Sequence, residues 1–408
     1  MALVLVDDSV LMNIASAIRS KAGSDDTYTP EHMANAIYGL GVSGSSPGII
    51  DDMINKTLSE AVFCSTQVIP SKAFDSFSIL TKVHFPECVE VSYAAFSWCT
   101  SLSDVSLPMC TTVGQYAFNM CTSLESIDLP SCTTVSDRAF YECSNLKSVS
   151  ASQCTHIGAY AFANCHALTE MHLTALSTIG SSAFYSCRSL ESVDFPNATT
   201  VSREAFASCV SLKNVNIPNI TTVYARTFEK CTSLMSVSFP LVSDVQNYAF
   251  YSCAGLSSVY LPACESMSYS AFAGCSILSE ISLPSCMSIG YAVFMRCEAL
   301  TDVELPVCKY VGESAFTQCS SLSVISLPAV QTILDNAFRS CVNLVELNMA
   351  SVSVVPTITS TNVFYNTPIG GYSDVAGELG RILVPSSLYL SFMSNRVWSL
   401  MSSVIVAV

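Results

Sequence analysis

Residues 102–123, LSDVSLPMCTTVGQYAFNMCTS, and residues 124–145, LESIDLPSCTTVSDRAFYECSN, carry the same types of residue at the same places. Both follow the pattern L-x-x-V-x-L-P-x-C-x-x-V-x-x-x-A-F-x-x-C, with an isoleucine for the first valine in the second stretch. Outward from this pair the phenylalanine recurs thirteen times with a constant 22-residue spacing, at Phe74, Phe96, Phe118, Phe140, Phe162, Phe184, Phe206, Phe228, Phe250, Phe272, Phe294, Phe316 and Phe338. The chain is therefore an array of repeats.

A single repeat unit has too few apolar positions to enclose a core of its own, so neighbouring units must stack and bury one another's inward side chains. The V-x-L segment alternates with polar residues at a period of two, which predicts one short parallel strand per coil. We expect the A-F-x-x-C segment to form a compact turn or a short helix on the opposite wall. The prediction is an α/β repeat solenoid of thirteen coils with the phenylalanines stacked along its interior.

Over residues 63–355 this pattern resembles the BspA-like class of leucine-rich repeats, in which a leucine-rich strand is followed by an AF-x-x-C-x-S-L stretch. The resemblance implies a leucine-rich-repeat fold. Members of that class are mostly surface or adhesion proteins, so the resemblance also implies binding, without naming a ligand.

The cysteines follow the repeat as well. Twelve of the 20 stand three residues after a repeat phenylalanine, and seven more, Cys88, Cys110, Cys132, Cys154, Cys264, Cys286 and Cys308, follow the strand. Disulfides and a metal site are alternatives, but stacked Cβ vectors do not converge and the paired C-x-x-C spacing of metal sites is missing. Because Phe77 takes the cysteine position in the first repeat, we expect buried thiols that act as small apolar fillers.

The two ends depart from the repeat. Residues 1–40 predict a helical hairpin, with apolar positions at Leu11, Ile14, Ile18, Met33 and Ile37, followed by a flexible Gly/Ser-rich linker at residues 41–48. Residues 49–62 predict an amphipathic helix that caps the solenoid, and residues 356–408 a C-terminal cap in which Pro385 and Ser386 begin a short helix.

The stretch IASAIRSKAG…YTPEHMANAIYGL within residues 1–40 resembles a short helical module at the start of phage tail-associated and other virion proteins. The resemblance implies that the five apolar hairpin residues anchor the chain to a capsid or tail protein. It also implies a virion location after synthesis in the host cytoplasm, with a cell surface as the alternative. A homo-oligomer on the particle is left open.

The composition of the chain limits the classes of molecule that it can bind. A net charge of −15 repels phosphate backbones and argues against nucleic acid, and no run of about 18 apolar residues offers a membrane span. The apolar stretch at residues 1–6 is too short for a secretory signal, so we expect no export signal. We find none of the common catalytic motifs and expect no enzyme activity, no cofactor and no metal.

Aromatic residues gather on either side of the repeat phenylalanine. They are rigid amphipathic rings that suit recognition surfaces and stacking on sugars, although rings packed between coils would give the same pattern. The candidate binding residues are Tyr93, Trp98, Tyr116, Tyr141, Tyr160, Tyr185, Tyr248, Tyr251, Tyr269 and Tyr291.

Three functions fit these observations. A phage virion protein would be anchored through its N-terminal helices and display a repeat rod that binds a host-surface or mucosal glycan or protein. The alternatives are a bacterial BspA-like surface adhesin and an intracellular protein-interaction scaffold.

Overall fold

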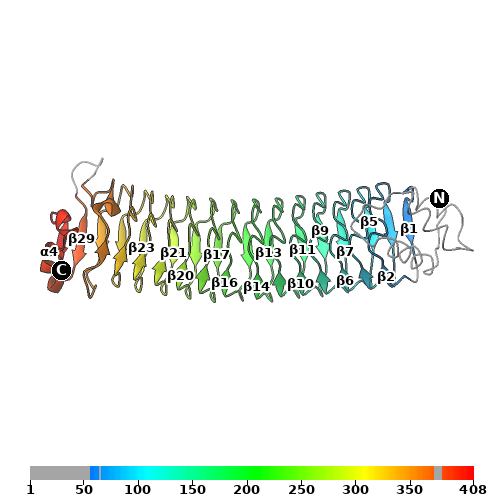
Figure 1. Cartoon of the computed structure of the whole chain (residues 1–408), viewed down its shortest axis with the longest axis horizontal. Coiled ribbons are helices and arrows are strands. Elements are labelled where there is room, and N and C mark those ends of the chain that lie inside the picture. The colour runs from blue at the N-terminus through cyan, green and yellow to red at the C-terminus, as the bar shows by residue number, and fades with distance from the viewer. Residues whose placement is uncertain (1–55, 64–65, 372–378) are drawn as a thin grey trace, which may run out of the picture. The chain divides into compact units, whose positions relative to one another are not determined.

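The computed structural model describes residues 56–63, 66–371 and 379–408. These residues belong to two compact units, and the boundary falls between Leu190 and Glu191. Each unit is built from successive coils of parallel strands, with the odd-numbered strands in one layer and the even-numbered strands as far as β28 in another (Figure 1).

Each coil of the first unit carries a strand of three residues and a strand of two. The three-residue strands are β1 (Glu60–Val62), β3 (Lys82–His84), β5 (Asp104–Ser106), β7 (Ser126–Asp128), β9 (Ser148–Ser150) and β11 (Glu170–His172). The two-residue strands are β2 (Val68–Ile69), β4 (Glu90–Val91), β6 (Thr112–Val113), β8 (Thr134–Val135), β10 (His156–Ile157) and β12 (Thr178–Ile179).

The second unit continues the same alternation. Its three-residue strands are β13 (Ser192–Asp194), β15 (Asn214–Asn216), β17 (Ser236–Ser238), β19 (Ser258–Tyr260), β21 (Glu280–Ser282), β23 (Asp302–Glu304), β25 (Val324–Ser326) and β27 (Glu346–Asn348). Its two-residue strands are β14 (Thr200–Val201), β16 (Thr222–Val223), β18 (Asp244–Val245), β20 (Ser266–Met267), β22 (Ser288–Ile289), β24 (Tyr310–Val311), β26 (Thr332–Ile333) and β28 (Thr357–Ile358).

The strand register repeats the sequence period. Val83 pairs with Val105 and Val259 pairs with Ile281, and the partners in each pair stand one repeat apart. The predicted repeat solenoid is confirmed, but the prediction of one strand per coil was incomplete. The valine or isoleucine near the middle of each repeat, such as Val113 or Ile157, lies in a second strand.

The predicted cap helix over residues 49–62 is wrong where the structure describes it. Residues 60–62 form β1, in which Ala61 is buried and pairs with Val83. The apolar spacing of this segment fits a helix, but it also fits a strand in register with the next coil. Pairing with β3 in that coil favours the strand. Residues 49–55 lie outside the described residues.

The phenylalanines form the core of each unit. In the first unit the rings of Phe118, Phe140 and Phe162 stack nearly parallel, with centroids 5.2 and 5.1 Å apart, and all three are fully buried. In the second unit the stack runs from Phe206 to Phe338 and ends on Phe364. The predicted aromatic interior is confirmed within each unit.

The described cysteines are free and buried, as predicted. The thiol of Cys143 donates to the carbonyl oxygen of Phe118 in the preceding coil at 3.1 Å, and Cys253 donates to Phe228 at 3.0 Å. Each thiol therefore fills a corner of the coil and also satisfies a buried carbonyl. Burial raises the pKa of both Cys143 and Cys253 to about 12, because the thiolate would lose its hydration.

The C-terminal residues close the second unit. The 3-10 helix η1 (Thr361–Phe364) precedes strand β29 (Arg381–Val384), and η2 (Ser386–Leu388), α4 (Tyr389–Ser394) and η3 (Trp398–Met401) follow before strand β30 (Ile405–Ala407). Trp398 is buried against Phe392, with ring centroids 5.4 Å apart, and its indole N–H donates to the Pro356 carbonyl oxygen at 2.7 Å. The expected short helix after Pro385 is present.

Candidate functional site

The wall that carries the repeat phenylalanines consists of turns, one from each coil, joined by hydrogen bonds between coils. Its backbone conformation determines which candidate side chains face the solvent. We call it the turn wall. Its alternate N–H groups donate to the next coil, as Tyr116, Phe118 and Met120 do to the carbonyl oxygens of Asp137, Ala139 and Tyr141. The residues two before and two after each phenylalanine adopt a left-handed backbone, with φ of 57° at Tyr116 and 60° at Met120. The Phe118 side chain is thereby buried, whereas the Tyr116 and Met120 side chains remain partly exposed.

Two adjoining hollows open on the turn wall of the first unit. The first, which we call the aromatic hollow, has a volume of about 380 Å³. It is lined by Trp98, Tyr116, Asn119, Met120, Arg138, Tyr141 and Glu142. Trp98 is 50% exposed, so a large hydrophobic residue faces the solvent beside an amide, a guanidinium and a carboxylate.

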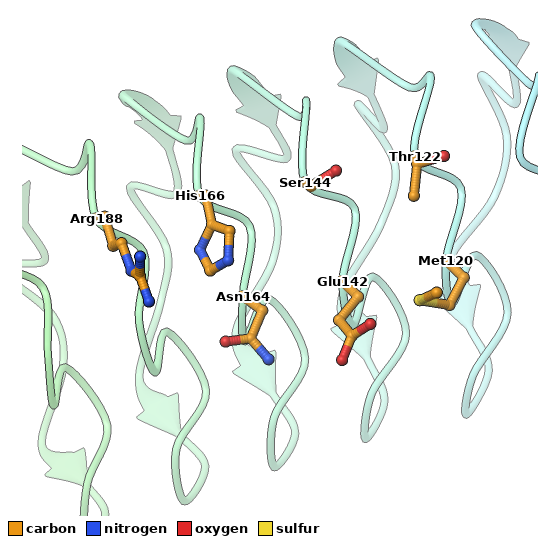
Figure 2. Close-up of a pocket in the computed structure, with 7 residues that line it drawn as sticks. All are labelled: Met120, Thr122, Glu142, Ser144, Asn164, His166 and Arg188. Carbon is orange, nitrogen blue, oxygen red and sulfur yellow. The ribbon is translucent and has the colours of Figure 1, made fainter.

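The second hollow, which we call the polar hollow, has a volume of about 360 Å³ and shares Met120 and Glu142 with the first. Its other lining residues are Thr122, Ser144, Asn164, His166 and Arg188. Figure 2 shows the side chains in two rows, and His166 and Arg188 extend from the row of Thr122 and Ser144 toward the row of Glu142 and Asn164.

Hydrogen bonds fix side chains that line the polar hollow and connect them to a side chain of the aromatic hollow. Nδ1 of His166 lies 3.0 Å from the carbonyl oxygen of Ser186, and because a carbonyl only accepts, Nδ1 carries the proton and Nε2 is left as an acceptor in the neutral ring. Nε of Arg188 donates to Oγ of Ser186 at 3.2 Å. The Asn164 amide donates to the Tyr141 hydroxyl at 3.5 Å, which joins the two hollows.

The charged groups of the hollows are only partly neutralised. Neither Arg138 nor Arg188 takes part in any of the ion pairs among the described residues, although the chain is strongly acidic. Burial, followed by a hydrogen bond to Glu142, raises the pKa of Tyr141, so the Tyr141 hydroxyl is protonated at neutral pH. The hollows therefore offer cationic donors, neutral donors and acceptors beside aromatic surface.

The hollows do not supply a nucleophile of the Cys-His type. Cys165 precedes His166 in the sequence, but its thiol donates to the Phe140 carbonyl oxygen and is fully buried. Burial raises the pKa of Cys165 well above its ordinary value. Its sulfur is therefore an interior filler.

The ten predicted aromatic residues fall into two groups. Trp98, Tyr116 and Tyr141 line the aromatic hollow. The structure places Tyr93, Tyr160 and Tyr185 on the same turn wall of the first unit, and Tyr248, Tyr251, Tyr269 and Tyr291 on that of the second.

Several of these rings pack on one another along the turn wall. Tyr93 meets Tyr116 edge-on at 5.8 Å in the first unit, and Tyr269 stacks on Tyr291 at 4.8 Å in the second. Packing between coils therefore accounts for much of the aromatic enrichment, and a binding role for the ten residues stays a prediction.

The sequence reasoning missed nine lining residues: Asn119, Met120, Thr122, Arg138, Glu142, Ser144, Asn164, His166 and Arg188. A signal for several of them was present in the repeat, because Met120, Glu142 and Asn164 occupy one offset and His166 and Arg188 another. The two histidines nearest to His166 in the sequence do not join it, because His156 and His172 lie in β10 and β11, whereas His166 lies on the turn wall.

Some expectations fall outside the described residues. The anchoring residues Leu11, Ile14, Ile18, Met33 and Ile37, with the hairpin and linker that they belong to, are among residues 1–55. Within the described ranges, no group of three or more His, Cys, Asp or Glu side chains is arranged to hold a metal ion. The helices in those ranges are all too short or too polar to cross a membrane.

The solved structures that are similar to this chain include two from bacteria. A leucine-rich repeat protein from Bacteroides ovatus superposes with a TM-score of 0.67 at 23% identity, over 86% of this chain and 94% of that protein. One from Eubacterium ventriosum gives a TM-score of 0.43 at 17% identity, over 80% and 87% of the two chains. No curated protein matches the sequence significantly.

The model of the BspA type leucine-rich repeat region matches residues 67–175, 155–263 and 243–369, which together span residues 67–369 of the 408. Its repeat is the one that forms the coils, the phenylalanine stack and the turn wall. The chain belongs to the BspA-type leucine-rich-repeat family.

Proposed function

We propose that the chain is a non-enzymatic binding protein that holds a saccharide of a host cell surface or mucus layer in the two hollows of its first unit. The observation that carries the proposal is the joining of the aromatic and polar hollows through shared residues. Sugar rings present an apolar face and a rim of hydroxyls, and a saccharide of two or more rings could use both hollows at once.

The chemistry of the lining supports a saccharide over an apolar ligand. Trp98 and Tyr141 offer ring surface for stacking, whereas Asn164, His166 and Glu142 offer donors and acceptors for hydroxyl groups. Both hollows are open surface features, and such features suit an extended chain of sugars better than an enclosed small molecule.

The same features favour binding over catalysis. Burial raises the pKa of the Cys165 thiol, which donates to the Phe140 carbonyl oxygen, and Nδ1 of His166 is held by the backbone carbonyl oxygen of Ser186. We therefore propose that the hollows recognise their ligand and leave it unchanged.

A glycan array tests this proposal. The wild-type chain should bind a set of saccharides, and Trp98→Ala should lose that binding, because the ring supplies the largest exposed surface of the aromatic hollow. Tyr291→Ala is the matched control, since it removes an exposed ring from the turn wall of the second unit and should bind normally. No saccharide binding, or equal losses in both variants, would contradict the proposal.

We further propose that residues 1–40 attach the chain to a capsid or tail protein of a phage particle, so that the solenoid is displayed toward the host. This part rests on the sequence resemblance of the predicted hairpin alone. Capsid and tail genes beside the coding gene would support it. A chromosomal gene without phage neighbours would favour a bacterial surface adhesin or an interaction scaffold, in which the hollows would serve the same kind of binding.

A further inference from the structure

Two arginines occupy the same place in the repeat and have the same aromatic neighbour. Arg138 and Arg226 each precede the repeat phenylalanine by two residues. Cζ of Arg138 lies 4.7 Å from the ring centroid of Tyr160, and Cζ of Arg226 lies 4.6 Å from that of Tyr248. The tyrosine is in both cases the equivalent residue of the following coil.

The two arginines differ in their partner for ion pairing. Arg226 donates through Nη1 to the Glu229 carboxylate at 2.8 Å, and Glu229 directly follows its repeat phenylalanine. The equivalent residue in the coil of Arg138 is Tyr141, which has no charge at neutral pH. Arg138 has no carboxylate partner among the described residues.

The surroundings of Arg138 restrict how its guanidinium can bind. Besides Tyr160, the Tyr116 ring lies 5.5 Å from Cζ of Arg138. Rings that contact a guanidinium hold it in place by cation–π attraction and leave its N–H donors for another partner. Arg138 lines the aromatic hollow, so those donors are within reach of a ligand bound there.

From this internal comparison we infer that Arg138 binds the carboxylate of an acidic saccharide, in the role that Glu229 fills for Arg226. A planar guanidinium matches a carboxylate with two parallel hydrogen bonds, and such charge-assisted bonds are strong. Trp98 and Tyr141 line the same hollow and would stack on the sugar ring that carries the acid. The inference rests on the proposed function and specifies the class of saccharide.

Arg188 and Glu142 have opposite effects on the affinity of this site for an anion. Arg188 in the polar hollow is a second cation without an ion-pair partner among the described residues, and it would favour a ligand with more than one acidic group. Glu142 lines both hollows and would repel an anion. Glu142→Gln should therefore strengthen binding of acidic saccharides relative to that of their neutral methyl esters.

The test compares saccharides that differ only in charge. An array carries sialylated, glucuronate and galacturonate oligosaccharides, each beside its methyl ester, with poly-glutamate as an acidic peptide. We expect binding of one or more acidic saccharides, no comparable binding of the esters, and weakening as NaCl is raised. Arg138→Ala should reduce the affinity about tenfold to a hundredfold, the loss of a charge-assisted hydrogen bond.

Matched variants distinguish the loss of the carboxylate contact at Arg138 from a general loss of structure. Arg226→Ala removes an equivalent arginine that is already paired and should leave binding unchanged. Tyr141→Glu should abolish acidic binding by supplying an internal carboxylate to Arg138, as Glu229 does to Arg226, whereas the uncharged Tyr141→Gln should lose only the contribution of the ring. Equal losses in the Glu and Gln variants would contradict the inference.

The outcomes distinguish this inference from the proposed function. Equal binding of acids and esters, with no effect of Arg138→Ala, would overturn the acidic site and leave saccharide binding standing. Arg138-dependent binding of poly-glutamate without any saccharide would overturn both, since the ligand would be an acidic peptide. Binding of no probe at all would also overturn both.

Discussion

The ring of Phe140 lies parallel to that of Phe162, with an interplanar angle of 2° and a centroid separation of 5.1 Å. The constant spacing of the phenylalanines in the sequence thus becomes a stack in which each coil depends on its neighbours. Phe140→Ala should cost about 3 to 5 kcal/mol in the free energy of unfolding, because it leaves a cavity between two coils. Chemical denaturation would measure the loss, and exposed Gln153→Ala should cost less than about 0.5 kcal/mol. Equal stability of the two variants would argue against a tightly packed stack.

The thiols predict how stability responds to alkali. Burial raises the pKa of Cys143 to about 12, above the ordinary value of 9.0, so the folded chain holds this proton longer than the unfolded chain. The stability contributed by the protonated thiol is complete below pH 9 and is lost as the pH rises toward 12. Between these limits the wild type should lose stability relative to Cys143→Ala by about 1.4 kcal/mol per pH unit. Denaturation curves of both proteins at several pH values would show this, and a constant difference would contradict it.

The turn wall predicts an unusual tolerance for glycine. Ser208 has a φ of 63°, and Gly274 and Asn164 occupy the equivalent position in other coils with φ of 80° and 63°. Because a left-handed backbone strains residues with a Cβ, Ser208→Gly should raise the free energy of unfolding or leave it unchanged, and Ser208→Val should lower it by about 1 to 2 kcal/mol. Thermal melting of the three proteins would rank them. A stable valine variant would show that the turn geometry is wrong.

Tyr160 predicts a positioning effect on ligand binding. Its ring holds the Arg138 guanidinium at 4.7 Å, so Tyr160→Leu should weaken binding of acidic saccharides by about 0.5 to 2 kcal/mol, the worth of a cation–π contact. Tyr160→Phe keeps the ring and should bind as the wild type does. Titration calorimetry would separate the two variants, and equal affinities for leucine and phenylalanine would remove this role. Unchanged melting temperatures would show that the coil itself is intact.

The proposed anchor predicts a separation of functions along the chain. A protein without residues 1–40 keeps every residue of the coils and the hollows, so it should stay folded and bind saccharide with unchanged affinity. It should no longer sediment with phage particles, because the predicted docking hairpin is gone. Sedimentation of the truncated protein together with the particles would refute the anchor and leave the binding site unaffected.

The repeat itself made much of the fold predictable. The regular period placed Phe140 and Cys143 in the interior, and the structure finds both fully buried. The second strand of each coil escaped prediction because two residues, such as Thr134 and Val135, are too short to show an alternation. The left-handed turns escaped it because inter-coil hydrogen bonds impose them on residues such as Tyr116 and Arg138, which have no preference for that backbone.

The candidate site was less predictable than the core. Aromatic enrichment indicated Trp98 and Tyr141, but Glu142 and His166 were missed, because a hollow is formed by residues from successive repeats rather than by neighbours in the chain. The contrast between Arg138 and Arg226 is present in the sequence as Tyr141 against Glu229. It gained meaning only when the structure showed that both arginines lie over equivalent tyrosines.

The fluorescence of Trp98 can report ligand binding in the aromatic hollow. It has two tryptophans, and Trp98 lies half-exposed in the aromatic hollow, whereas Trp398 is fully buried near the C-terminus. In Trp398→Phe all tryptophan fluorescence comes from Trp98, so titration with a saccharide that binds should shift and saturate the emission at the affinity found by calorimetry. An emission that stays constant while calorimetry shows binding would place the ligand elsewhere and contradict the assignment of the hollows as the binding site.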